Sequence, residues 1–195
     1  MICAILLAGG KSSRMGKNKA FLELDGRTFF DIMLDKLCSL NPHEIMVSGE
    51  PDVFLPALGK RDRKMPIQII PDIVKEKGPL GGLYSCMNKT SCSTVLVVST
   101  DVPLISVDTL NDILQDHIAN DHDATVLVSG EGPEPLIAVY STRICPVIGE
   151  LIDKDSLRIR DLFDLIDTHF KRSYRNPSEL YNCNTPEDYH LLLSR

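Results

Sequence analysis

The chain has no apolar run near the roughly 20 residues that a membrane-spanning helix needs. Its first apolar stretch, residues 2–8, is too short for a signal peptide, lacks a basic leader and runs directly into glycines. It also has no excess of positive charge: the formal net charge is −6, whereas a general nucleic-acid binder needs a basic face to replace phosphate counterions. These absences argue against a membrane protein and against a nucleic-acid-binding protein.

No Cys-x-x-Cys pair occurs among the six cysteines, and the five histidines are not spaced as metal ligands. The cysteines are scattered, and several stand in apolar runs, as small buried residues do. A disulfide framework and a zinc site are therefore not expected. We expect instead a cytoplasmic protein with reduced thiols.

Short apolar runs alternate with longer amphipathic segments, and the sequence holds neither an internal repeat nor a low-complexity stretch. Runs rich in Ile, Val and Leu predict strands buried on both faces, over residues 2–7, 44–47, 67–70 and 94–98. Apolar residues recur at helical spacing over residues 28–40 and 106–119, and Ser106 is the expected N-cap of the second helix. This alternation predicts an α/β protein, a three-layer α/β/α sandwich around a mainly parallel, Rossmann-like sheet.

The second half of the chain is less regular. A strand, a turn, a second strand and two helical segments are predicted in order, over residues 124–128, 130–135, 136–140, 146–153 and 157–165. Thr185 is expected to cap a final helix that has Pro186 in its first position. No linker rich in Ser, Gly or Pro divides the chain, so we expect one domain over residues 1–195.

Basic residues and glycines concentrate directly after the first predicted strand. Four of the nine residues from Lys11 to Lys19 are Lys or Arg, although 21 in 195 are basic over the whole chain. Glycines let a backbone approach a ligand closely, and successive exposed N–H groups bind anions. Lysine and arginine add positive charge for phosphate oxygens. The loop over residues 7–16 is therefore predicted to hold phosphate, rather than to be a solvated basic loop.

Two better-known phosphate-binding motifs are absent. Gly10-Lys11-Ser12 resembles the end of a Walker A loop, but the glycine required five residues before Gly10 is Ile5. Gly-x-Gly-x-x-Gly occurs nowhere in the sequence. Neither a P-loop ATPase nor a dinucleotide-binding dehydrogenase is supported.

Polar residues follow several predicted strands at the point where each strand ends. Asp101 comes after residues 94–98 and close to a proline that fixes the loop, where its carboxylate can hold magnesium; a turn or helix cap is the alternative. Ser48 and Asp72 follow the second and third strands, and the glycine-rich residues 78–82 precede a helix. In a parallel sheet these positions share the rim where open α/β sheets bind ligands. The pattern predicts a site for a phosphorylated ligand and a metal.

Five motifs that span nearly the whole chain carry a resemblance to a known family. They are Leu7-Ala8-Gly9-Gly10-x-Ser-x-Arg14-Met15-Gly16-x-x-Lys19, Gly78-Pro79-Leu80, Asp101-x-Pro103-Leu104, the run from Pro135 to Tyr140, and the run from Asn182 to Asp188. On these motifs the sequence resembles the MobA-like branch of the nucleotidyltransferases, and specifically the molybdenum-cofactor guanylyltransferases. Sugar-phosphate and cytidylyl-transferring relatives share the first motif, whereas the second and the last favour the guanylyl branch. The resemblance implies the fold type of the nucleotide-diphospho-sugar transferases.

The resemblance also implies an activity. Such an enzyme transfers GMP from GTP onto the terminal phosphate of molybdopterin, with Mg²⁺ as its metal, and releases pyrophosphate. The implied nucleotide-binding half covers residues 1–105, and the acceptor-binding half covers residues 106–195. The resemblance allows for other molybdenum-cofactor biosynthesis proteins and acceptor molybdoenzymes as partners. The alternatives are CMP transfer onto molybdopterin, nucleotidyl transfer onto a sugar phosphate, and a non-catalytic nucleotide-binding regulator.

The family's site can be carried onto matching positions of this sequence. The implied catalytic residues are Arg14 and Lys19, which stabilise the departing pyrophosphate, and Asp101, which binds the metal. The implied nucleotide-binding residues are Leu7, Ala8, Gly9, Gly10, Lys19, Ser48, Asp72, Gly78, Pro79, Leu80 and Asp101. Two positions depart from the family pattern: Ser48 stands where Asn is frequent, which leaves its contact with base or ribose open, and Asn18 stands where Asp is common.

The implied acceptor-binding residues are Arg158, Asn182 and Asn184. Either Asn182 or Asn184 completes the metal or cofactor site, and the motif does not distinguish them. Arg158 and Arg160 either hold the pterin phosphate or lie on a solvated helix face.

Overall fold

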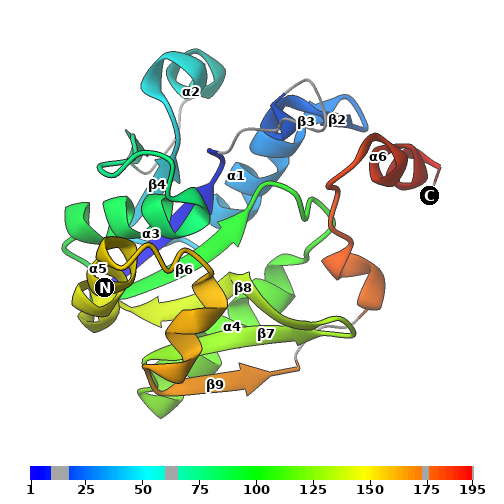
Figure 1. Ribbon diagram of the computed structural model, residues 1–195. Helices are drawn as coiled ribbons and strands as arrows, with labels where there is room; N and C mark the ends of the chain where they lie inside the picture. Colours follow the sequence, from blue (N-terminus) through cyan, green and yellow to red (C-terminus); the bar gives the residue numbers. More distant parts are fainter. Residues whose placement is uncertain (10–17, 60–65, 173–175, 195) are drawn as a thin grey trace.

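The six predicted strands and one further strand form one sheet in the computed structural model, which describes residues 1–9, 18–59, 66–172 and 176–194 (Figure 1). The strand order is β5-β4-β1-β6-β8-β7-β9. Neighbouring strands are parallel except where β8 pairs with β6 and β7. The strands are β1 (Ile2–Leu7), β4 (Glu44–Ser48), β5 (Ile67–Ile70), β6 (Thr94–Ser99), β7 (Ala124–Ser129), β8 (Gly132–Ser141) and β9 (Thr168–Lys171). The predicted, mainly parallel sheet is confirmed.

Both faces of the sheet are covered because side chains alternate along each strand. In β1, Cys3, Ile5 and Leu7 join one buried cluster, and Ala4 and Leu6 join another on the opposite face. The first cluster contains buried residues of α3 (Gly78–Lys89) and α5 (Cys145–Asp153). The second contains those of α1 (Phe29–Ser39) and α4 (Val107–Asn120), and Phe54 from α2 (Pro51–Leu58). The predicted three-layer sandwich is therefore confirmed.

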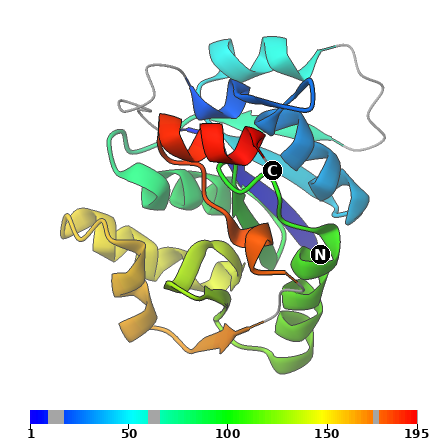
Figure 2. The same ribbon diagram turned by 90° about the vertical axis from the view of Figure 1, so that its right-hand side faces the viewer.

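Capping residues set the starts of three helices. Thr28 accepts from the Asp31 backbone N–H at 3.1 Å before α1, and Ser106 accepts from the Thr109 N–H at 3.1 Å before α4. Thr185 caps α6 (Pro186–Leu193) in a capping box. The expected caps at Ser106 and Thr185 are confirmed. The Tyr189 hydroxyl then donates to the Glu23 carbonyl at 2.7 Å, so the C-terminal segment crosses the molecule to reach the N-terminal half (Figure 2).

Two predictions for the second half were wrong in extent. The turn expected over residues 130–135 is shorter, because β8 begins at Gly132 and pairs Pro133 with Val128. Prolines fit there because β6 pairs only with residues 137–141 of β8, so residues 132–136 form a sheet edge toward β6. The helix expected over residues 157–165 is the 3₁₀ helix η3 (Ile159–Asp164). Its apolar residues pack against the core, as they would in the predicted α-helix.

Several short elements were not predicted. They are α2, β9, the hairpin of β2 (Glu23–Leu24) and β3 (Arg27–Thr28), and the 3₁₀ helices η1 (Lys19–Phe21), η2 (Thr142–Ile144) and η4 (Pro177–Leu180). The hairpin had a recognisable signal in the Asp25-Gly26 pair, which favours a two-residue type I′ turn. In the structure these residues have the positive φ that this turn requires, 52° and 73°. In the described part of the chain, none of the helices has the length and apolar character that crossing a membrane requires.

Candidate active site

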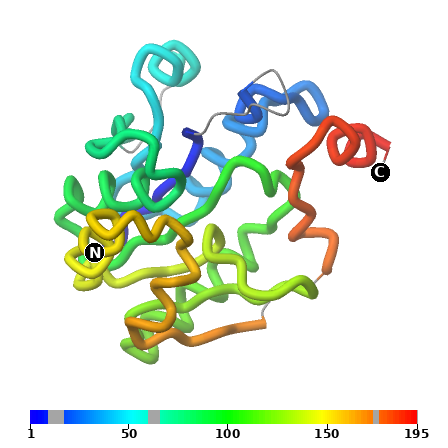
Figure 3. Tube along the Cα trace, in the orientation of Figure 1, coloured from blue at the N-terminus to red at the C-terminus, as the bar shows by residue number. Residues whose placement is uncertain are grey.

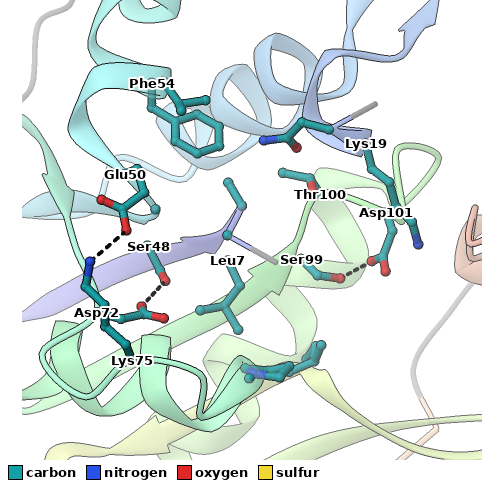
Figure 4. Close-up of a pocket in the computed structure, with 18 of the residues that line it drawn as sticks. Leu7, Lys19, Ser48, Glu50, Phe54, Asp72, Lys75, Ser99, Thr100 and Asp101 are labelled. Carbon is teal, nitrogen blue, oxygen red and sulfur yellow. Dashed lines mark hydrogen bonds and ion pairs between the residues drawn. The ribbon is translucent and has the colours of Figure 1, made fainter. Parts of the chain in front are cut away.

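A cavity of about 930 Å³ opens at the edge of the sheet where β1, β4, β5 and β6 end (Figure 4). These parallel strands lie side by side, so the segments that follow them meet at one rim. Figure 4 shows two groups of polar side chains, with Leu7 between them. One group contains Ser48, Glu50, Asp72 and Lys75, and the other contains Lys19, Ser99, Thr100 and Asp101.

Backbone hydrogen bonds fix the end of β1 between its two neighbours. The N–H groups of Ala8 and Gly9 donate to the Ser48 carbonyl at 3.2 and 2.8 Å, and the Thr100 N–H donates to the Leu7 carbonyl at 3.3 Å. These bonds hold together the floor of the cavity. They also mean that the N–H groups of Ala8 and Gly9 are already bonded inside the protein.

The first polar group centres on Asp72. The Ser48 hydroxyl donates to its Oδ1 at 3.4 Å, and burial raises the pKa of the Asp72 carboxyl. The loop beyond it is held because the Ile73 N–H donates to the hydroxyl of buried Ser85 at 2.8 Å. Asp72 is therefore a preorganised hydrogen-bond acceptor on one wall of the cavity.

The N-terminus of α3 forms the wall beside Asp72, with Gly78 and Pro79 lining the cavity. Close packing brings this helix to the strands: a Cβ added at Gly82 would lie 2.3 Å from the Ser48 Oγ and 3.3 Å from the Leu7 Cδ2. Only glycine leaves room for this approach. The absence of a side chain at Gly82 thus sets where Ser48 and Leu7 stand.

Gly82→Ala should displace Ser48 and break its hydrogen bond to Asp72. We expect a loss of about 1–3 kcal/mol in stability, as for other overpacked cores. Thermal unfolding measures this loss. The matched control is Gly130→Ala, since no described atom lies within 4 Å of a Cβ added there. Equal behaviour of the two variants would show that the Gly82 contact does not shape the cavity.

The second polar group joins three distant parts of the chain. The Lys19 Nζ donates to the Asn184 Oδ1 at 2.5 Å, and the Ser99 hydroxyl donates to the Asp101 Oδ1. The Cys183 N–H donates to the Asp101 carbonyl at 2.8 Å. The segment that carries Cys183 and Asn184 is therefore held against the Asp101 loop, although about 80 residues separate them in sequence.

The charges around the cavity fit a divalent cation. Among the described residues, two lysines and four carboxylates line the cavity: Lys19, Lys75, Glu50, Asp72, Glu76 and Asp101. A cation between these carboxylates and a bound polyphosphate would lower the repulsion between like charges. In the described ranges no three His, Cys, Asp or Glu side chains group as a metal site. Mg²⁺ suits such a place, because it binds through one or two carboxylates, substrate phosphates and water.

The structure brings most of the predicted site residues together. Those that line the cavity are Leu7, Ala8, Gly9, Lys19, Ser48, Asp72, Gly78, Pro79 and Asp101. Asn184 contacts Lys19, and Asn182 is exposed two residues earlier. Gly10 and Arg14 lie outside the described residues.

Besides Asn182 and Asn184, two further predicted residues do not line the cavity. Leu80 is completely buried in the core cluster under α3, so it supports the wall from behind. The Arg158 side chain is 87% exposed and pairs with Asp161 at 3.4 Å. Arg158 is therefore exposed to solvent, and its contact with the acceptor stays a prediction.

Several lining residues were missed in the sequence. They are Gly49, Glu50, Val53, Phe54, Lys75, Glu76, Ser99, Thr100 and Leu136. Glu50 and Thr100 had a signal, because each follows a predicted strand within a few residues. Leu136 had none, since it reaches the cavity from the strand that runs against its neighbours.

Residues 4–171 match the family model described as the MobA-like NTP transferase domain. The chain belongs to the MobA-like NTP transferase family. It is therefore an enzyme of the nucleotidyltransferase class, as its motifs predicted.

Individual relatives agree with this membership of the MobA-like family. A Bacillus subtilis protein is 31% identical, over 96% of this chain and 92% of its own, and a Flavobacterium johnsoniae protein is 28% identical, over 97% and 90%. Both are called "probable molybdenum cofactor guanylyltransferase". A solved structure from Archaeoglobus fulgidus, molybdopterin-guanine dinucleotide biosynthesis protein A, superposes with a TM-score of 0.83 at 18% identity, over 100% of this chain and 97% of that one. This last likeness shows the shared fold.

Proposed function

We propose that this MobA-like enzyme transfers GMP from GTP onto the terminal phosphate of molybdopterin, in the cytoplasm. One observation carries the proposal: a single cavity has an acceptor-rich wall at Asp72 and, across Leu7, a lysine and a carboxylate at Lys19 and Asp101. A nucleoside triphosphate needs both sides of such a cavity, one to bind its base and the other to bind its phosphates. The names of the two bacterial relatives support guanine and the molybdenum cofactor.

Asp72 is the proposed base-recognising residue. Guanine presents two neighbouring N–H donors on one edge, and a carboxylate accepts both in a two-pronged arrangement. The Ser48 hydroxyl orients the Asp72 carboxylate, and Gly78 and Pro79 let the ribose lie close to the backbone. Cytosine presents a donor beside an acceptor, so an ionised carboxylate fits it less well.

Asp101 is the proposed ligand of Mg²⁺, with Asn182 or Asn184 completing the site. A carboxylate accepts several bonds, so the hydrogen bond from Ser99 leaves Asp101 able to bind a metal. Bound Mg²⁺ supplies positive charge to the nucleotide phosphates. Lys19, held by Asn184, and Arg14 are proposed to stabilise the charge that builds up on the departing pyrophosphate.

The proposed reaction is an in-line displacement at the α-phosphorus of GTP. An oxygen of the molybdopterin phosphate forms the new phosphorus–oxygen bond, and the bond to the β-phosphate breaks to release pyrophosphate. The second pKa of a phosphate monoester is about 6, so the attacking oxygen is ionised at neutral pH and needs no general base. The work of the protein is to align two anions and to neutralise their charge.

Residues 1–105 are proposed as the nucleotide-binding half and residues 106–195 as the acceptor-binding half. The second half reaches the cavity through Leu136 and, at Lys19, through Asn184. Lys77 pairs with Asp155 at 2.7 Å, so the segment that leads to Arg158 lies against the start of α3. Other molybdenum-cofactor biosynthesis proteins and acceptor molybdoenzymes remain proposed partners for delivery and release of the cofactor.

The proposed base specificity is tested by thermal unfolding with GTP, CTP, ATP or UTP and Mg²⁺, since a ligand stabilises the fold in proportion to its occupancy. GTP should give the largest shift. Asp72→Asn should weaken GTP binding by about 10- to 100-fold, because it removes charged hydrogen bonds. Since burial raises the pKa of Asp72, GTP binding to the native protein should weaken on acidification at a higher pH than an exposed aspartate would give.

The control is Asp153→Ala, an exposed aspartate at the end of α5. A larger shift with CTP would favour cytidylyl transfer. An unchanged GTP affinity in Asp72→Asn would remove Asp72 from the base site.

A further inference from the structure

Lys36 holds the loop that carries Asp101. It lies in the last turn of α1, and its Nζ donates to the carbonyls of Pro103 and Ile105, at 2.6 Å each. These residues follow Asp101 by two and four positions. The ammonium group is thus hydrogen-bonded directly to the backbone that leads from the proposed metal ligand into α4.

Glu179 binds the same loop where it enters α4. Its Oε2 accepts from the Ser106 N–H at 3.3 Å, the Ser106 hydroxyl at 2.8 Å and the Thr109 hydroxyl at 2.6 Å. These donors form the N-terminus of α4, where a negative charge is favourable. Lys36 and Glu179 also attract each other electrostatically. The loop over residues 102–106 is therefore held by a cation at two of its carbonyls and by an anion at the N–H and hydroxyl groups that begin α4.

The chain continues from Glu179 directly to the site. Four residues later the Cys183 N–H donates to the Asp101 carbonyl, and the next residue, Asn184, accepts from Lys19. Figure 3 shows this orange-to-red segment running beside the green loop that follows β6. The position of Asn184 relative to Asp101 thus depends on where Glu179 is anchored.

A partly buried lysine is a costly way to hold a loop. Removing an ammonium group from water opposes folding, and burial lowers the pKa of Lys36 to about 8. An apolar side chain of similar length would avoid this cost, but it would leave the carbonyls of Pro103 and Ile105 without their donor and Glu179 without its cation. The ammonium group is therefore kept for the bonds that it makes to the loop.

We propose that Lys36 and Glu179 are positioning residues that keep the Asp101 loop and residues 182–184 in register across the cavity. The inference rests on the proposed function for its kinetic consequence, but the register itself is a property of the protein without ligand. Neither side chain lines the cavity. Both would act through Asp101 and Asn184.

The test compares Lys36→Met with Lys89→Met. Both lysines lie in the last turn of a helix, but Lys89 is exposed at the end of α3. In Lys36→Met, amide hydrogen exchange should become faster in residues 101–106 and 181–184 together. The melting temperature should also fall, because the carbonyls of Pro103 and Ile105 lose their donor and Glu179 loses its cation. The Mg²⁺ concentration for half-maximal transfer should rise about 10- to 100-fold, as for other residues that orient a metal ligand. Lys36→Arg, which keeps charge and donors, should lie closer to the native protein, and Glu179→Gln should repeat the effect of Lys36→Met in weaker form.

The readouts separate the two proposals. Faster exchange in both segments of Lys36→Met, together with a native protein that transfers no GMP, would overturn the proposed function and leave the positioning roles standing. Exchange that is unchanged, or that rises in one segment only, would overturn the positioning roles whatever the activity. So would a large loss of melting temperature with a normal Mg²⁺ dependence, since this is the result of a purely structural lysine.

Discussion

Asp101→Ala should reduce nucleotidyl transfer by about 10³-fold or more while the protein stays folded. The carboxylate is the proposed metal ligand, and without it the cavity loses the group that places positive charge between the phosphates and the remaining carboxylates. The fold should survive because the contact with Cys183 uses the backbone carbonyl of Asp101, which the substitution leaves in place. Steady-state rates over a Mg²⁺ titration, with circular dichroism of the same sample, measure both effects.

GTP should still bind to Asp101→Ala, since the proposed base site at Asp72 lies on the other side of Leu7. The thermal shift with GTP should therefore become independent of Mg²⁺ rather than disappear. Asp153→Ala, with an exposed carboxylate that is not part of the cavity lining, should match the native enzyme. Retention of a normal, Mg²⁺-dependent rate in Asp101→Ala would remove the metal from this position.

Lys19→Ala should lower turnover by about 10²- to 10³-fold, the usual loss when a group that stabilises developing charge is removed. Lys19 lines the cavity from η1, and Asn184 holds its ammonium group at 2.5 Å. An interaction made mainly in the transition state affects kcat more than KM, so the KM for GTP should change less. Steady-state kinetics at saturating Mg²⁺ separate the two constants.

Asn184→Ala should lie between the native enzyme and Lys19→Ala, because it frees the lysine without removing its charge. The exposed Lys89 gives the control, and Lys89→Ala should leave kcat unchanged. If Lys19→Ala had native kinetics, the pyrophosphate would have to be stabilised elsewhere. If it lost GTP affinity with an unchanged kcat, Lys19 would be a binding residue only.

The sheet could be predicted because each of its central strands is recognisable from its own short run of residues. Runs of Ile, Val and Leu over residues 2–7 and 94–98 are buried on both faces, and this alone defines parallel strands inside a sandwich. The start of β8 could not be predicted in this way. Glycine and proline over residues 130–135 read as a turn, and their compatibility with a strand depends on how far β6 extends beside them.

The rim of the site was predictable for a related reason. Once the strands are parallel, Ser48, Asp72 and Asp101 must lie along the same edge of the sheet, since each stands at or just after the end of a strand. Contacts between distant segments carry no local signal. Lys19 and Asn184 are 165 residues apart, and Lys36 reads as an ordinary lysine on a helix until its two carbonyl partners are seen. Leu80 shows the reverse case, where a motif residue turns into the core.

The central claim is most directly tested by the release of pyrophosphate when the native protein is mixed with GTP, Mg²⁺ and molybdopterin. We expect release only when all three are present, in equal amount to the guanine dinucleotide product. It should be lower with CTP in place of GTP and lost when Mg²⁺ is chelated. Release of pyrophosphate without molybdopterin, or faster release with CTP, would contradict the proposed acceptor or base, and no release under any of these conditions would contradict guanylyl transfer itself.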